Sequence, residues 1–173
     1  MRVSVFVGTS LDGFIARRNG DLDFLPEGGG EPHGYTEFFA SVDAIVIGRK
    51  TYEKVLTFGA WPYGKKAVFV LSTHTLSPAP IDGTIERMSG EPSEILSQLN
   101  ARGVRHIYVD GGLTIQRFLR AGLVQRLTIT RVPVLIGDGI PLFGTVPRDI
   151  ALRHVATRHY VSGLVQSEYD VIT

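Results

Sequence analysis

The chain has 173 residues, of which 43% are hydrophobic and 20% are charged, and its formal net charge is +1. This length and composition predict one domain over residues 1–173, and the near-neutral charge excludes nucleic-acid binding driven by bulk electrostatics. The absence of cysteine excludes disulfides and thiol chemistry, and the sequence shows no signal peptide or membrane span, so we expect a cytoplasmic protein.

The first predicted element is a strand over the alternating residues 1–8, and a turn from Gly8 to Gly13 follows it. This turn carries hydroxyls and the Asp12 carboxylate, so it is either a plain turn or a place for a proton-handling group. Residues 25–34 contain four glycines and two prolines, which predict an irregular loop, either a surface loop or a lid near a site. A short helix over residues 35–40 follows, and its aromatic side faces either the core or a ligand.

Two apolar strands in the first half end in small, hydroxylic or basic residues. Residues 44–47 end in Gly48, Arg49 and Lys50, with Thr51 at the start of a helix. Residues 67–71 end in Ser72 and Thr73. Helix amides beside cations suit an anion, although a basic pair at a helix start is often only a solvated surface.

A helix is predicted from Pro92 to Gly103, with proline at its start and glycine as its C-terminal cap. Residues 106–109 then form a strand that turns at Asp110-Gly111-Gly112 into a helix over residues 115–119. Paired glycines at a strand-to-helix turn let the backbone approach a phosphate, or simply make a tight connection. Together, the three strand ends suggest one phosphate-rich ligand across the carboxyl edge of a sheet.

The last third of the sequence predicts strands alone. Residues 123–136 are rich in β-branched residues, and Pro133 implies an edge position or a bulge. Residues 150–157 and 164–172 alternate as a pair of antiparallel strands. The whole order predicts an α/β fold in three layers, with a mostly parallel central sheet and an antiparallel C-terminal edge.

Several common kinds of site are not predicted. The five histidines are scattered without metal-ligand spacing, so no metal site is expected. There is no Walker sequence, no Gly-x-Gly-x-x-Gly spacing, and no assignable Ser/His/Asp order.

Five short motifs in order resemble the dihydrofolate-reductase-like superfamily, and within it the RibD C-terminal reductase domain of the bifunctional riboflavin-biosynthesis deaminase/reductase. These motifs, which cover essentially the whole chain, are Ser10 to Ala16, Gly48 to Glu53, Leu71 to Thr73, Asp110 to Gly112, and Val132 to Phe143.

The resemblance implies the dihydrofolate-reductase-like fold and NADPH binding. The nicotinamide would lie near Val7, Gly8 and Ile15, and Arg49 would hold the 2′-phosphate. The implied cofactor-binding set also includes Gly48, Lys50, Thr51, Leu71, Ser72, Thr73, Gly111, Gly112, Leu113, Thr114 and Ile115.

The implied activity is that of a 5-amino-6-(5-phosphoribosylamino)uracil reductase-like enzyme, which transfers hydride to a small polar heterocycle or a related carbonyl. Asp12 and Asp110 are the expected catalytic residues, and Asp12, Phe39 and Asp110 the expected substrate contacts. The resemblance also implies a homodimer that buries residues 123–136, with Phe118, Leu123 and Val132 packed there or in the chain's own core.

Two alternatives stay open. A dihydrofolate reductase has an acidic residue where this sequence has Pro32, so folate reduction would require Glu31 or Glu37 to replace it. A non-catalytic nucleotide-binding protein would keep the phosphate-binding turns without a competent acid. Neither a deaminase domain nor a clear site for a substrate phosphate is evident.

Overall fold

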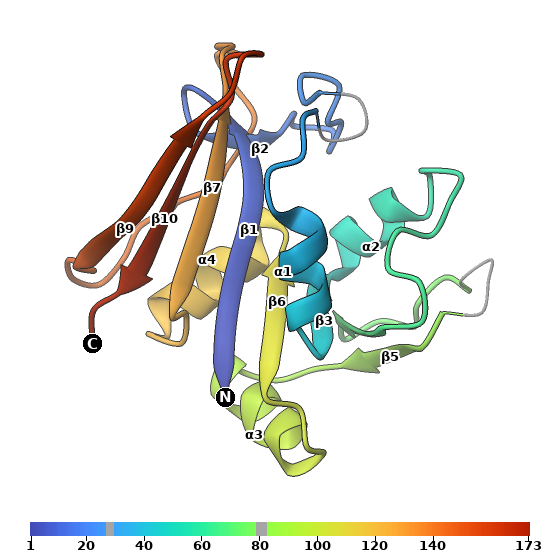
Figure 1. Cartoon of the computed structure of the whole chain (residues 1–173). Coiled ribbons are helices and arrows are strands. Elements are labelled where there is room, and N and C mark those ends of the chain that lie inside the picture. The colour runs from blue at the N-terminus through green and yellow to red at the C-terminus, as the bar shows by residue number, and fades with distance from the viewer. Residues whose placement is uncertain (27–29, 79–82) are drawn as a thin grey trace.

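The structure is a computed structural model that describes residues 1–26, 30–78 and 83–173. Its centre is an eight-stranded sheet in the order β5-β4-β3-β6-β1-β7-β10-β9 (Figure 1). The strands of this sheet are β1 (Arg2–Ser10), β3 (Ala44–Gly48), β4 (Ala67–Leu71), β5 (Ile85–Met88), β6 (His106–Asp110), β7 (Arg126–Val132), β9 (Leu152–His159) and β10 (Val165–Val171). A two-stranded sheet pairs β2 (Phe14–Ala16) with β8 (Ile140–Pro141).

All neighbouring strands from β5 to β7 are parallel, and β10 and β9 complete the sheet in antiparallel pairings. The mostly parallel sheet with an antiparallel C-terminal edge is therefore confirmed. The late strand pair lies within two residues of its predicted bounds, because the alternation of its sequence marks both strands well.

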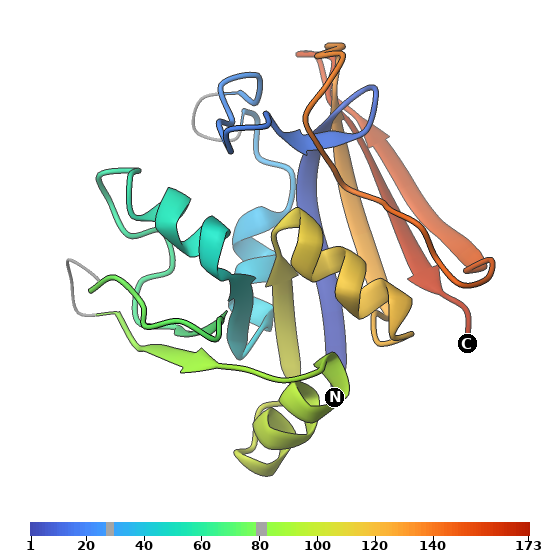
Figure 2. The same ribbon diagram turned by 180° about the vertical axis from the view of Figure 1, so that it is seen from behind.

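Helices cover both faces of the sheet (Figures 1 and 2). Helices α1 (Tyr35–Ser41) and α2 (Arg49–Val55) lie on one face, and α3 (Pro92–Ala101) and α4 (Gly112–Arg120) lie on the other. Because successive side chains of a strand point to opposite faces, β3 supplies Ala44 and Val46 to the core under α3 and α4, and Ile45 and Ile47 to the core under α1 and α2. This arrangement confirms the three-layer α/β/α fold.

The helix ends follow local chemistry. At the start of α3, Glu91 and Glu94 form a capping box and Pro92 occupies the first turn, while Gly103 takes a φ of 88° just past the helix end. Helix α2 begins at Arg49, two residues before the predicted start at Thr51, because Gly48 is its N-cap and leaves the strand directly.

The strand predicted over residues 123–136 is shorter in the structure, and it lies inside the sheet and not at its edge. β7 ends at Val132, so Pro133 lies beyond the strand and makes neither an edge nor a bulge in it. β7 also has neighbours on both sides, β1 and β10, which removes the expected open edge. Phe118 is fully buried in the core under α4, and Val132 is also buried.

Candidate functional site

A cavity of about 750 Å³ opens where the carboxyl ends of β1, β6 and β7 meet the start of α2, which follows β3. Parallel strands bring these ends to one edge of the sheet, which is the usual place for a ligand in an open α/β sheet. The predicted site residues that line the cavity are Val7, Gly8, Ile15, Lys50, Thr51, Asp110, Gly111 and Gly112. The predicted loop over residues 25–34 contributes Leu25, Pro26 and residues 30–34 to the wall, whereas its residues 27–29 lie outside the described part of the chain.

Two strand-to-helix turns beside the cavity pack against each other reciprocally. The spacing Gly-x-x-Thr occurs at Gly48 and Thr51, before and in α2, and again at Gly111 and Thr114, before and in α4. A Cβ on Gly48 would lie 2.9 Å from Thr114 Oγ1, and a Cβ on Gly111 would lie 2.5 Å from Thr51 Oγ1. The glycines therefore let the two helix starts lie side by side, which draws two sets of free helix amides together.

Gly112 has a different constraint, because a Cβ there would lie 2.8 Å from Ile140 Cγ2 and 3.2 Å from the Pro141 carbonyl oxygen. The close approach that this glycine permits in the structure is to β8. A bulky residue at Gly112 would thus disturb the chain itself before it met any ligand.

Both helix starts have donors for an anion. In the described structure neither the N-cap of α2 nor that of α4 makes a side-chain capping hydrogen bond. The first amides of α4, a helix of nine residues, are therefore available to a ligand, and they carry the positive end of the helix dipole. Lys50 and Lys54 of α2 line the cavity nearby, and Lys54 is paired with Asp21.

The residues predicted for the 2′-phosphate lie one strand further along the sheet, outside the cavity lining of the described residues. Gly48 pairs with Leu71 in the β3–β4 register, so Arg49 and Ser72 directly follow paired positions. Arg49 Nη1 lies 3.0 Å from Glu53 Oε1, and both side chains are more than one-third exposed. Arg87 of β5, which the sequence analysis did not single out, donates to the Ser72 carbonyl at 3.3 Å.

Asp110 lies at the wall of the cavity in contact with buried tyrosines. Its Oδ1 accepts a hydrogen bond from the Gly111 amide at 2.8 Å, and its Oδ2 lies 3.3 Å from the Tyr108 hydroxyl. Burial raises the pKa of Asp110, and the hydrogen bonds from Gly111 and Tyr108 only partly oppose this effect. A carboxyl group of this kind can carry a proton at a higher pH than an ordinary aspartate.

Asp12 has the opposite environment. Its carboxylate accepts hydrogen bonds from the amides of Ile136 at 3.3 Å and Gly137 at 2.8 Å, and it is not among the described residues that line the cavity. A hydrogen bond from the Ser10 side chain lowers the pKa of Asp12, and the amides of Gly137 and Ile136 add to this effect. Asp12 therefore joins the turn after β1 to the turn at Gly137. It does so in the ionised form, which has no proton to donate.

The remaining predicted residues are divided between core and surface. Thr114 and Ile115 are buried in α4, while Leu113 is 65% exposed. Phe39 contributes to an aromatic cluster next to the cavity, with its ring centroid 5.9 Å from that of Tyr35 and 6.5 Å from that of Tyr63.

From the sequence, only the aromatic side of the helix over residues 35–40 was considered as a ligand contact, and the aromatic wall of the site extends beyond that helix. Tyr35, Phe58, Tyr63 and Tyr108 all line the cavity. Burial raises the pKa of Tyr35 to about 12, and the negative charge of Asp110 contributes. These rings come from α1, the chain after α2, and β6, so no local motif groups them. Glu31, His33 and Glu37 complete this side of the cavity.

A family model for the RibD C-terminal domain matches residues 2–166 of the chain. The chain belongs to the RibD C-terminal domain family. Within this family context, the chain is 32% identical over 161 residues to the uncharacterized protein YwjB of Bacillus subtilis, with 90% of each chain covered.

Two solved structures place the RibD-type chain among its structural relatives. It resembles the crystal structure of a putative riboflavin biosynthesis protein from Shewanella, with a TM-score of 0.91 and 37% identity over the full length of both chains. It also shares its fold with dihydrofolate reductase from Enterococcus faecalis, with a TM-score of 0.72 and 16% identity over 99% of this chain and 97% of that one. The dihydrofolate-reductase-like α/β fold is thereby confirmed.

Two further observations describe what the structure holds. No helix in residues 1–26, 30–78 and 83–173 has the length and apolar character to cross a membrane. Over the same residues, no group of three or more histidine or acidic side chains is arranged to hold a metal ion.

Proposed function

We propose that the chain is an NADPH-dependent reductase of the riboflavin-reductase-like branch, which transfers hydride to a small polar heterocycle or a related carbonyl. The observation that carries this proposal is one cavity that contains both the glycine turns and the aromatic rings, with Asp110 hydrogen-bonded to Gly111 and to Tyr108 between them. The glycine turns offer helix amides and lysines suited to phosphates, and the aromatic rings beside the Asp110 carboxyl group suit a flat heterocycle. Membership of the RibD C-terminal family supports the same reaction class.

The residues present fit the cofactor. The uncapped start of α4 after Gly111 and Gly112, together with Lys50 and Thr51, would hold the pyrophosphate. Arg49, Ser72 and Thr73 would hold the 2′-phosphate, with Arg87 beside them. Val7, Gly8 and Ile15 would contact the nicotinamide at the end of β1, and the dihydrofolate reductase of similar fold was solved with NADP(H).

When bound, NADPH supplies the hydride. The protein's part is to position the rings and to provide a proton. We assign the proton to Asp110, whose partly buried carboxyl group faces the cavity and has a raised pKa. The Gly111 amide and the Tyr108 hydroxyl fix the orientation of that carboxyl group.

The test is the stability of the purified protein with and without NADPH. At a hundredfold excess over its Kd, a ligand stabilises the folded state by about 2.7 kcal/mol. For a chain of this length, that free energy corresponds to a rise in Tm of roughly 5–10 °C. An unchanged Tm at saturating NADPH contradicts the proposal, whichever substrate is used.

Dihydrofolate reduction is a second candidate, because Glu31 and Glu37 both line the cavity. Glu31 Oε1 already accepts hydrogen bonds from the amide and hydroxyl of Ser162, so Glu37 is the better placed to hold an amidine. Loss of NADPH absorbance with dihydrofolate, abolished in Glu37→Gln, supports this candidate. Turnover that survives in Glu37→Gln and Glu31→Gln removes its chemical basis.

We further propose that the protein works in the cytoplasm as a homodimer. The edge of β7 cannot be the interface, since β10 already covers it. The exposed edge strand β9 and its half-buried neighbour β10 are the remaining candidates at that end of the sheet.

A further inference from the structure

The cavity as a whole has an unusual balance of charge. Its acidic side chains are Glu31, Glu37 and Asp110. Its cations, among the described residues, are Lys50 and Lys54, which both belong to α2, and no arginine lines it. Lys54 is paired with Asp21, and Lys50 stands in the first turn of α2 beside the glycine turns. Lys54 thus already has a carboxylate partner, and Lys50 would contact the phosphates of the bound cofactor. Neither lysine is then available to bind a phosphate of the substrate.

The part of the chain outside the described residues cannot supply the missing cation. Residues 27–29 and 79–82 are Glu27, Gly28, Gly29, Ala79, Pro80, Ile81 and Asp82. None of these is basic, and two are acidic.

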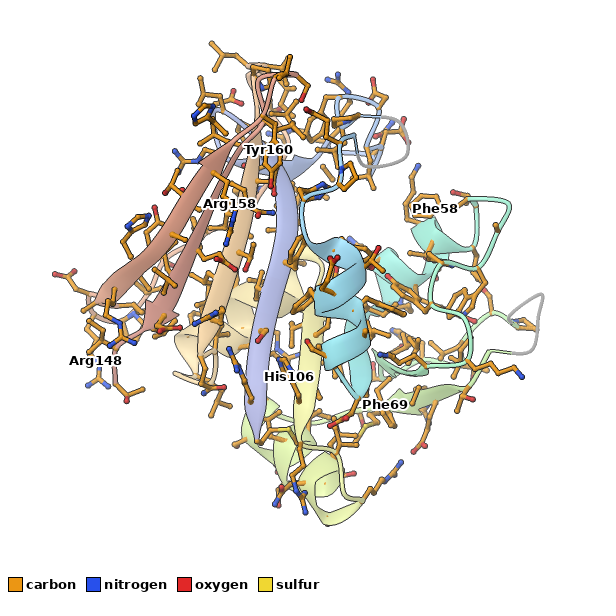
Figure 3. The ribbon with its side chains drawn as sticks, viewed as in Figure 1. Phe58, Phe69, His106, Arg148, Arg158 and Tyr160 are labelled. Carbon is orange, nitrogen blue, oxygen red and sulfur yellow. The ribbon has the colours of Figure 1, made fainter. Side chains whose placement is uncertain are left out.

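Three arginines line a different cavity. A second cavity of about 610 Å³ lies on the other side of α1, over β1, β7, β10 and β9, and contains Arg2, Arg126 and Arg158. Figure 3 shows Arg158 and Tyr160 over these outer strands and Phe58 beyond α1 on the opposite side. Arg126 is paired with Asp170 and Arg158 with Glu168, so both guanidinium groups already have carboxylate partners.

The wall between the two cavities does not offer a phosphate site either. Both cavities share His33 and Glu37. Glu37 stands in the first turn of α1, where its carboxylate would repel a phosphate at the free amides of that turn. His33 Nδ1 lies 2.7 Å from the Glu31 carbonyl oxygen and its ring lies 5.8 Å from that of Phe6, so it is held against the sheet.

The aromatic side chains indicate which kind of ligand the cavity can bind. Tyr35, Phe58, Tyr63 and Tyr108 present ring faces and edges, and the Tyr35 and Tyr108 rings meet edge to face at 6.3 Å. A flat ring can pack against such a surface, and its amino groups can donate to the carboxylates nearby.

We propose that the substrate is an uncharged, planar, amino-bearing heterocycle that carries no phosphate. This inference rests on the proposed reductase function and narrows it, because it sets the chain apart from an enzyme that reduces a phosphoribosyl substrate. With the cofactor bound, a phosphate dianion of the substrate would meet three carboxyl groups and no arginine in the described lining of the cavity, and those carboxyl groups would not replace its hydration.

The experiment measures the affinity of NADPH-saturated protein for cytosine and cytidine 5′-monophosphate, by chemical-shift titration. The two probes share one amino-bearing ring and differ in the ribose phosphate; cytidine separates the effect of the ribose. Cytosine is expected to bind at least tenfold more tightly than the monophosphate. Equal or tighter binding of the monophosphate, or no binding of cytosine, overturns the inference.

A pair of variants shows whether the cavity causes this preference. Glu37→Lys reverses one charge in the cavity wall, and Asp149→Lys makes the same change in charge at an exposed residue outside the lining. Glu37→Lys should reduce the ratio of the two affinities at least threefold, and Asp149→Lys should leave it unchanged. Equal effects of the two variants would mean that net charge sets the preference, and would overturn the inference.

The NADPH stability measurement on the same samples separates the two proposals. Without an effect of NADPH, the reductase function fails. If NADPH stabilises the protein as expected but the protein prefers the monophosphate, the reductase function stands and only the proposed substrate class is wrong.

Discussion

Arg49 is the residue whose proposed role is most specific to one cofactor. NADPH and NADH differ by the 2′-phosphate, and Arg49 stands beside Ser72 at the ends of paired strands. Its ion pair with Glu53 is exposed and contributes about 0.3–0.5 kcal/mol, so Glu53 can release it to a phosphate at little cost.

Arg49→Ala should weaken NADPH binding by about 1.5–3 kcal/mol, the usual contribution of a hydrogen bond to a charged group, and should leave NADH binding nearly unchanged. The measurement is the Kd of both cofactors. Arg120→Ala, which removes an exposed arginine at the end of α4, is the matched control. Equal losses for the two cofactors would assign Arg49 a structural role.

Replacing Asp110 should lower the activity of the protein and raise its stability at high pH. Its folded-state pKa is raised, so the folded protein binds a proton that the unfolded chain has already lost at the same pH. Its contribution to stability is therefore complete below the unfolded pKa and falls as the pH rises through the folded pKa.

Asp110→Asn keeps an oxygen for the Gly111 amide and removes the ionisation. We expect the free energy of unfolding above the folded pKa of Asp110 to be higher in the variant, and its decline with rising pH to be smaller. The kcat of the reductase should fall by about 10²-fold or more, as for other general acids. Denaturant unfolding across pH 4–9 and steady-state kinetics test both effects, and a variant with unchanged kcat excludes Asp110 as the proton donor.

At the scale of elements, the reciprocal Gly-x-x-Thr turns hold α2 and α4 together. Gly111 has a φ of 95° as well as the short distance to Thr51, so an alanine there suffers both backbone strain and a steric clash.

Gly111→Ala should lower the free energy of unfolding by about 1–3 kcal/mol. Part of this loss should return when Thr51→Ala is added, because the nearest atom of residue 51 is then its Cβ at 3.4 Å. A double-mutant cycle in urea measures the coupling. Strictly additive effects would show that the two turns do not depend on each other.

The same turns explain how much of the site was predictable. A glycine or hydroxyl after an apolar strand is a local signal, so the turns that we propose for phosphate binding could be located from the sequence. In the structure these turns lie together, with Gly111 against Thr51 and Gly48 against Thr114. The aromatic wall gave no such signal, because Tyr35, Tyr63 and Tyr108 belong to separate elements. They meet only where α1 and the chain after α2 pack against β6. For β7, the run of β-branched residues continued past Val132, although the strand pairing did not.

At the scale of the whole molecule, the sheet has an exposed edge at β9. Every residue of β9 is exposed or half-buried, and Leu152 and Val155 are 41% and 43% exposed. Val165 on the neighbouring β10 is similarly exposed at 41%. An uncovered edge strand with apolar side chains tends to associate, although Arg153 and Arg158 on β9 oppose unspecific pairing.

If these outer strands form the homodimer interface, a charge in their apolar part should separate the protomers. Light scattering of the wild-type protein at micromolar concentration should give about twice the 18.9 kDa chain mass, and Val155→Lys should give the chain mass itself. Ala101→Lys on α3, which adds the same charge far from β9 along the sheet, should remain dimeric and serves as the control. Because Val155 lies outside the cavity lining of the described residues, the monomeric variant should bind NADPH as the wild type does. A wild-type mass of one chain would remove the dimer, and a Val155→Lys dimer would move its interface away from β9.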